Sequence, residues 1–135
     1  MSEEVIEVDV KKIFEELKGK ISQLDYAWER YVEIVKDFSK DWYVKKTLIQ
    51  QKIMEKNALT NYYRDKILEL EVKKSVGLID EENYNTLKED YKEKLDEALE
   101  ELNYIKETLK ELEDRATRHL KRVFIEAIYG DKEEI

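Results

Sequence analysis

The stretch Tyr84–Ala127, YNTLKEDYKEKLDEALEELNYIKETLKELEDRATRHLKRVFIEA, decides the fold of this chain. Its apolar positions follow one another at steps of three or four residues: Tyr84, Leu87, Tyr91, Leu95, Ala98, Leu102, Ile105, Leu109, Leu112, Ala116, Leu120, Val123 and Ala127. The mean spacing is about 3.6 residues, the period of a nearly straight α-helix. No proline or glycine interrupts it. We therefore expect one long helix from Glu81 to Tyr129, ending at Gly130.

The residues just before this helix predict a tight reversal of the chain. Gly77 can adopt the left-handed backbone conformation that commonly ends helices. Asp80 follows as an N-cap, and Glu81 and Glu82 stand in the first turn, where the helix dipole favours acidic side chains. An antiparallel hairpin that turns near Gly77 is expected. Its other helix carries Leu48, Ile49, Ile53, Leu59, Tyr63, Ile67 and Leu70.

A second apolar stripe lies nearer the N-terminus and forms our candidate association seam. Its steps alternate strictly between four and three residues, which is the a/d pattern of a coiled coil. The seam consists of Leu17, Ile21, Leu24, Trp28, Tyr31, Val35, Phe38 and Trp42. Four of these eight residues are aromatic, and two-stranded coiled coils rarely accommodate side chains of that size. The stripe therefore favours a bundle of three or four helices.

The pattern weakens after this seam, because Lys45 falls where the next apolar residue is due. Ser39 and Asp41 are both able to cap a helix, so we expect a break at Ser39–Asp41. The alternative is one uninterrupted helix reaching about Lys74. The predicted fold class is all-α: an elongated helical bundle of two to three long, coiled-coil-like helices.

The expected domain organisation is simple. Residues 1–8 form a short flexible N-terminal arm, residues 9–130 form a single helical domain, and residues 131–135 form a polar tail. Ile6–Val10 alternates apolar and acidic residues as an edge strand does. Asp9 as the N-cap of the first helix is the competing interpretation.

Composition narrows the classes of protein that fit. Of the 135 residues, 43% are charged and 41% hydrophobic, with no proline and three glycines, which is typical of long helices. The net charge of −8 argues against a dedicated nucleic-acid binder. The chain starts without a signal-peptide pattern and has no apolar run long enough to span a membrane, so a cytoplasmic location is expected. Abundant Glu, Lys, Ile and Tyr hint at a thermophilic source.

The sequence also lacks the residues of several common active sites. His119 is the single histidine and there is no cysteine, so neither a paired Glu-x-x-His di-iron site nor a thiolate nucleophile can be formed. Three scattered glycines cannot make a phosphate-binding loop. We therefore predict a protein that is not an enzyme and carries no cofactor or metal.

Charge is unevenly distributed along the chain. Four cations and no acid occur in residues 115–122, and five lysines against two carboxylates occur in residues 40–56. A hairpin about Gly77 brings these two runs together at the end opposite the turn. They supply a candidate interaction patch of Lys45, Lys46, Arg115, Arg118, Lys121 and Arg122. The simpler interpretation is that these cations complement helix dipoles and pair with Glu111, Glu113 and Asp114.

These features together predict a structural or interaction protein, a coiled-coil adaptor or scaffold subunit that acts by helix–helix association. Bare apolar stripes mark association sites, and a homodimer is the simplest way to bury them. Another protein is the expected partner. The alternative is a module that binds nucleic acid or another polyanion through the basic patch.

Overall fold

The computed structural model describes the backbone of residues 8–133 and the side chains of residues 8–124. It contains two α-helices, α2 (Val10–Ser75, 66 residues) and α3 (Glu81–Glu133, 53 residues), and no strand within the described residues. The all-α prediction is therefore confirmed. Val10 is the first residue of α2, and Val8 and Asp9 before it belong to no strand. Ile6 and Glu7, the other residues of the alternative edge strand Ile6–Val10, lie outside the described residues.

The first helix is longer than expected. α2 runs without interruption through Ser39 and Asp41, so the predicted break there is wrong. The Ser39 hydroxyl donates to the carbonyl oxygen of Lys36 at 2.7 Å, which satisfies this polar side chain inside the helix and not as a cap. At a rise of about 1.5 Å per residue, α2 is roughly 100 Å long.

Local hydrogen bonds account for three of the four helix ends. At the start of α2, the Asp9 carboxylate accepts from the backbone N–H of Lys12 at 3.2 Å, as an N-cap does. At its end, the N–H of Leu78 reaches the carbonyl of Lys73 (2.8 Å) and that of Gly77 reaches Lys74 (3.2 Å). This is the Schellman arrangement, and Gly77 adopts the φ of +77° that it requires.

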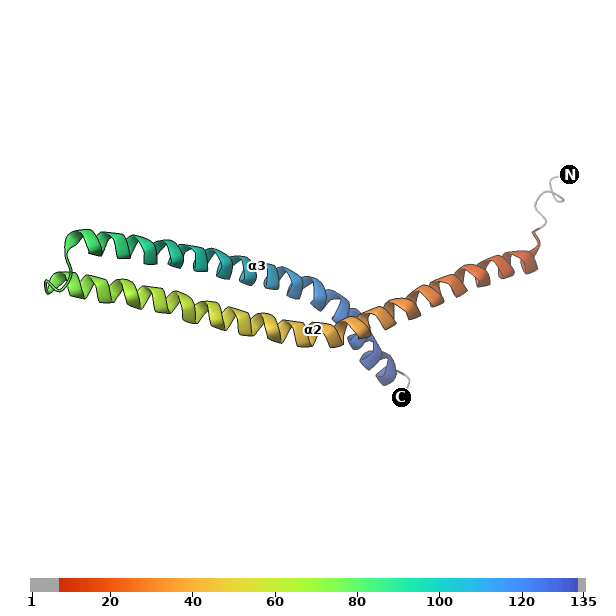
Figure 1. The fold of residues 1–135 in the computed structure, drawn as a ribbon. Helices are drawn as coiled ribbons and strands as arrows, with labels where there is room; N and C mark the ends of the chain where they lie inside the picture. Colours follow the sequence, from red (N-terminus) through yellow and green to blue (C-terminus); the bar gives the residue numbers. More distant parts are fainter. Residues whose placement is uncertain (1–7, 134–135) are drawn as a thin grey trace.

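The second helix begins at a matching cap and runs back along the first. The Asp80 carboxylate accepts from the N–H of Asn83 at 2.8 Å. From there α3 lies beside α2 along most of its length (Figure 1). The backbone helix continues past Gly130 to Glu133, three residues beyond the expected end.

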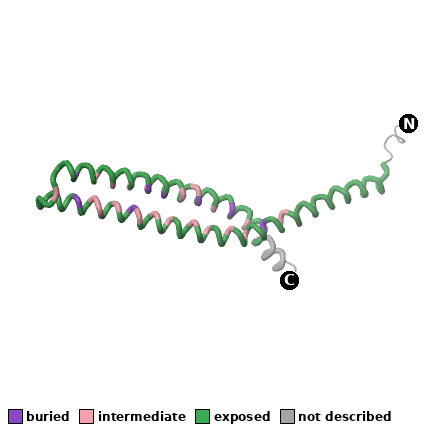
Figure 2. Tube along the Cα trace, viewed as in Figure 1, coloured by how far each residue is buried: buried purple, intermediate pink, exposed green. Residues whose placement is uncertain are grey.

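The core of this hairpin is a narrow strip where the helices face each other (Figure 2). α3 buries six of the positions predicted from its period: Tyr84, Ala98, Leu102, Leu109, Ala116 and Val123. Two other predicted positions, Leu87 and Leu112, are exposed. From α2, only Val35, Thr60 and Leu70 are buried to the same degree. The described residues contain two helices, so they do not by themselves form the bundle of three or four that the aromatic seam suggested.

Candidate functional site

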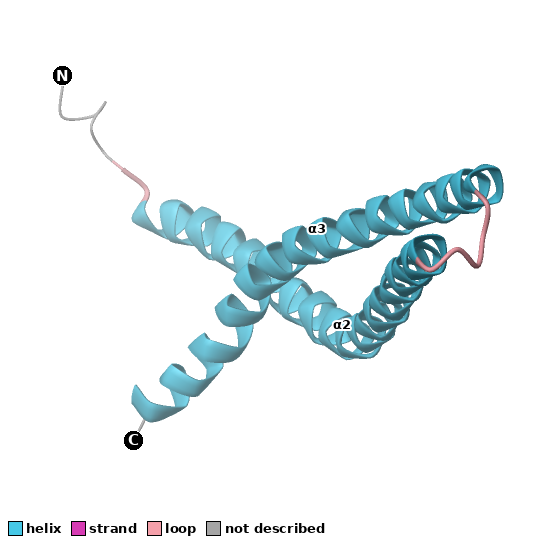
Figure 3. Ribbon diagram, turned by 90° about the vertical axis from the view of Figure 1, so that its left-hand side faces the viewer, coloured by secondary structure: helices cyan, strands magenta, loops and turns pink. Residues whose placement is uncertain are grey.

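Within the described residues, no helix lies beside the N-terminal part of α2. Beyond the point where α2 and α3 cross, the two helices diverge, and residues 10–30 project alone (Figures 1 and 3). We call this part the α2 extension. Every one of its residues is exposed. It nevertheless carries a continuous apolar face, the extension stripe, made of Val10, Ile13, Phe14, Leu17, Ile21, Leu24 and Trp28.

The extension stripe lies on the same face of α2 that packs against α3 from Tyr31 onward. Trp28 stacks beside Tyr31 with ring centroids 5.7 Å apart, at the boundary between the two parts. Leu24 is 68% exposed, whereas Val35, on the same face, is 4% exposed. The structure thus divides the predicted association seam. Leu17, Ile21, Leu24 and Trp28 are exposed, while Tyr31, Val35 and Trp42 contribute to the contact with α3, together with Phe38 at its edge.

An apolar cavity, the junction groove, opens where the helices begin to diverge. Its volume is about 490 Å³. It is lined by Tyr31, Ile34, Val35, Phe38, Trp42, Lys45 and Ile49 of α2 and by Leu112, Arg115, Ala116 and His119 of α3. Across its end, the Tyr31 hydroxyl and Nδ1 of His119 share a hydrogen bond of 2.7 Å. Phe38 and Trp42 stack along one wall, 5.8 Å between centroids.

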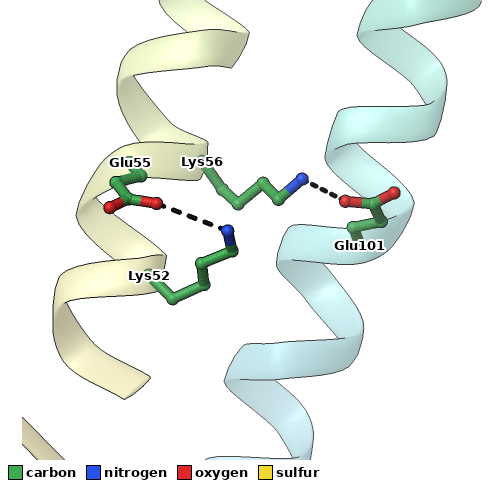
Figure 4. Close-up of polar contacts among 4 residues, drawn as sticks. All are labelled: Lys52, Glu55, Lys56 and Glu101. Atoms are coloured by element: carbon green, nitrogen blue, oxygen red, sulfur yellow. Dashed lines mark hydrogen bonds and ion pairs between the residues drawn. The ribbon is translucent and has the colours of Figure 1, made fainter. Parts of the chain in front are cut away.

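Most lysines of the basic run in α2 are paired with carboxylates. Lys45 contacts Asp41 at 2.9 Å within the helix, and Lys46 reaches Glu113 of α3 at 3.3 Å. Lys52 pairs with Glu55 at 3.4 Å, and Lys56 bonds Glu101 across the helix interface (Figure 4). These contacts correspond to the simpler interpretation of the charge pattern, since they neutralise much of this run locally.

The basic residues of α3 have a different setting. Arg115, Arg118, Lys121 and Arg122 are exposed, and within the described residues none of them forms an ion pair. Arg115 and Lys45 line the same junction groove, so the hairpin does bring the two basic runs side by side. Lys46 instead turns to Glu113 and a cation–π position 5.9 Å from the Trp42 ring.

Three polar residues of α2 belong to the interface. The sequence pattern did not predict Lys56 or Thr60 there, and it placed Lys46 in the basic patch, with pairing to Glu113 as the simpler interpretation. Lys46 and Lys56 are half-buried and Thr60 is 2% exposed, all on the face toward α3. Thr60 is satisfied because its hydroxyl donates to the carbonyl of Asn57 at 2.8 Å. The two lysines place their hydrocarbon stems in the interface and their ammonium groups on Glu113 and Glu101.

The pair formed by Lys56 and Glu101 has a measurable electrostatic consequence. The hydrogen bond and charge of Lys56 lower the pKa of the Glu101 carboxyl below its ordinary value of 4.5. The Lys56 side chain is the more enclosed of the two, at 19% exposed against 58% for Glu101. Glu101 therefore keeps its charge, and its contact with α2, to a lower pH than a free carboxylate would.

Three searches found no match or site: a comparison of the chain with known proteins and, within the described residues, a search for metal-binding clusters and a search for membrane-spanning helices. No protein family, curated protein or solved structure matches this chain. Within the described residues, no group of three or more His, Cys, Asp or Glu side chains is arranged to hold a metal ion. In the same part of the chain, neither helix has an apolar stretch long enough to cross a lipid bilayer.

Proposed function

We propose that this chain is a non-enzymatic structural or interaction protein, an adaptor or scaffold subunit that acts by helix–helix association. The observation that carries the proposal is the extension stripe. The same apolar face that packs on α3 from Tyr31 onward continues uncovered to Val10. At about 1.5 Å per residue it presents a surface roughly 30 Å long. Apolar faces of this extent on one helix favour a partner helix.

In this proposal the hairpin is a rigid support for the α2 extension. Its two helices hold each other through a core strip and cross-helix ion pairs, and they fix the direction in which the α2 extension points (Figure 2). The extension belongs to the same uninterrupted helix, so a partner bound there is rigidly joined to the hairpin. Such an arrangement suits a spacer or scaffold that connects two bodies.

A pair of charge-matched variants tests the proposal. Leu17→Glu with Leu24→Glu places charges on the stripe, and Ser22→Glu with Tyr26→Glu places the same charges off it. Helicity of both is checked first. We expect the stripe variant to lose self-association or a protein partner recovered from the source cells, and the off-stripe variant to retain it. If both variants keep every association of the natural chain, the proposed function is wrong.

A second candidate function rests on the basic residues of α3, which form no ion pair within the part of the chain that the structure describes. Arg115, Arg118, Lys121 and Arg122 lie within two turns of one helix, and clustered cations attract nucleic acid or another polyanion. Arg118→Glu with Arg122→Glu should abolish retention of DNA or heparin at low salt. Lys92→Glu with Lys94→Glu, in the acidic part of α3, is the matched control. Equal retention by both variants contradicts this function.

A further inference from the structure

We propose that the partner of the α2 extension is the α2 extension of a second copy of this chain, paired antiparallel so that Ile21 of one copy lies opposite Leu24 of the other. The inference rests on the proposed function and names the occupant of the extension stripe. It follows from the charges of the extension, the sizes of its apolar residues and the position of the junction groove.

Charge determines the direction of pairing. Residues 10–21 contain four lysines and two glutamates, whereas residues 22–33 contain three carboxylates and one arginine. The two halves of this segment therefore carry opposite net charge. A parallel pair sets like halves side by side, but an antiparallel pair sets the basic half of each copy along the acidic half of the other. Electrostatic complementarity of this kind fixes orientation and register.

The sizes of the apolar residues fit the same direction. In an antiparallel pair, a positions of one helix face d positions of the other. Trp28 then lies opposite Leu17 of the second copy, and Ile21 lies opposite Leu24. In a parallel pair, Trp28 meets Trp28 and Phe14 meets Phe14, which stacks the largest side chains in the same layers. The antiparallel register separates the two Trp28 side chains and places each opposite a leucine.

The junction groove accounts for the two ends of the pair. In this register Phe14 of each copy reaches the level of Tyr31 of the other, and Val10 reaches the level of Val35. Tyr31 and Val35 both line the groove, which is apolar and about 490 Å³ in volume. The tip of one extension thus enters the space where α2 and α3 of the other copy diverge. One occupant therefore covers the stripe and the end of the groove that Tyr31 and Val35 form.

The chain has no cysteine, so single spin labels can report this geometry directly. Lys12→Cys and Ser22→Cys each replace one exposed residue off the stripe. In the proposed dimer, labels at Lys12 lie about 32 Å apart along the helix axis, because 21 residues separate their levels. Labels at Ser22 lie near the two-fold axis, so their axial separation is close to zero. Dipolar electron-spin measurements at tens of micromolar distinguish the two distances.

Three results overturn the inference: a 16.3 kDa monomer in sedimentation equilibrium at these concentrations, a short Lys12 distance indicating a parallel pair, or a long Ser22 distance indicating another register.

Leu17→Glu with Leu24→Glu should weaken the dimer by at least about 100-fold, since each copy would bury two unpaired charges. A monomer whose stripe variant still loses a different protein partner would refute this inference and leave the proposed function standing.

Discussion

The two parts of α2 differ in a way that composition alone does not explain. The part covered by α3 includes Lys46, Lys56 and Thr60 on its inner face, yet these residues are half-buried or buried. The α2 extension has an uninterrupted apolar stripe, yet all its residues are exposed. Burial within one chain is therefore decided by where α3 lies and not by which part of α2 is more hydrophobic.

This contrast supports the proposal that the extension is the part of the chain that gains a partner. An interface that is always covered tolerates polar residues, because lysine stems fill space and their ammonium groups find carboxylates on the neighbouring helix. A surface that must gain a partner from solution depends more on apolar area, since burial of such area drives association. The extension, whose stripe contains apolar residues only, is the part of α2 that has no helix beside it within the described residues.

The same substitution made in both regions should give the largest difference. Leu102 in α3 is 4% exposed and Leu24 in the extension is 68% exposed. Leu102→Ala should cost about 2–4 kcal/mol of unfolding free energy, because it leaves a cavity in a narrow core. Leu24→Ala should cost less than about 0.5 kcal/mol in the monomer. Chemical denaturation at low protein concentration measures both.

Raising the protein concentration sharpens that comparison. If extensions pair, the cost of Leu24→Ala should grow with concentration, because the dimer stabilises only the folded chain. The cost of Leu102→Ala should stay nearly constant. Equal costs for the two variants at low concentration would show that the extension is already buried in the isolated chain.

The two described glycines should respond with opposite signs. Gly77 has a φ of +77°, a region in which a side chain costs roughly 1–2 kcal/mol, so Gly77→Ala should destabilise the hairpin. Gly19 lies inside the extension with open space around its Cα. Gly19→Ala should stabilise the local helix by about 0.5–1 kcal/mol. Hydrogen exchange of residues 10–30 reports the second effect, and a loss of protection there would contradict it.

The sequence was sufficient to predict the helical class and the buried face of α3. Tyr84, Leu102 and Leu109 are buried as the period of α3 predicts. At two positions the inner face instead includes the half-buried Lys88 and Glu113, while the neighbouring Leu87 and Leu112 are exposed. The Asp80 N-cap was also predictable, because the Asp80 carboxylate accepts a hydrogen bond from the backbone N–H of Asn83, only three residues further along the chain. Such local patterns depend little on what packs around them.

The continuation of α2 was not predictable by the same rule. Its inner face proceeds through Ser39, Trp42, Lys46 and Ile49, so the next position after Trp42 is Lys46 and not Lys45. In the sequence, a lysine at an inner position looks like the end of the apolar stripe, because the carboxylate that pairs with it on the other helix is not known. Glu113 lies 67 residues further along the chain, and only the fold shows that Lys46 reaches it. The same holds for Lys56 and Glu101.

Loss of the hydrogen bond at the crossing should have a smaller effect than Gly77→Ala and an effect similar in size to that of Gly19→Ala. Tyr31→Phe removes the hydroxyl that bonds Nδ1 of His119 but keeps the ring that packs on Trp28. We expect a loss of about 0.5–1 kcal/mol in unfolding free energy, since both partners remain partly accessible to water. Nitrogen chemical shifts of the single imidazole should change as well.

Tyr26→Phe is the matched control for the crossing. Tyr26 is also in α2 but lies off the stripe and is 67% exposed, so removal of its hydroxyl should leave both stability and the His119 signals unchanged. If Tyr31→Phe behaves like this control, the hydrogen bond does not contribute to holding the helices where they diverge.

The smallest predicted effect concerns Glu101 and depends on pH. Because Lys56 lowers the pKa of Glu101 in the folded chain, the pair contributes stability above the ordinary pKa of 4.5 and loses it as the pH falls through the folded value. Glu101→Gln should therefore destabilise the hairpin at neutral pH, and its stability should converge with that of the natural chain at a pH well below 4.5.

Glu100→Gln is the control, because Glu100 lies among the acidic side chains of the outer face, where neutralisation removes repulsion. Denaturation curves at both pH values compare the three proteins. A constant difference between Glu101→Gln and the natural chain at all pH values would show that the charge of Glu101, and so its ion pair with Lys56, does not stabilise the hairpin.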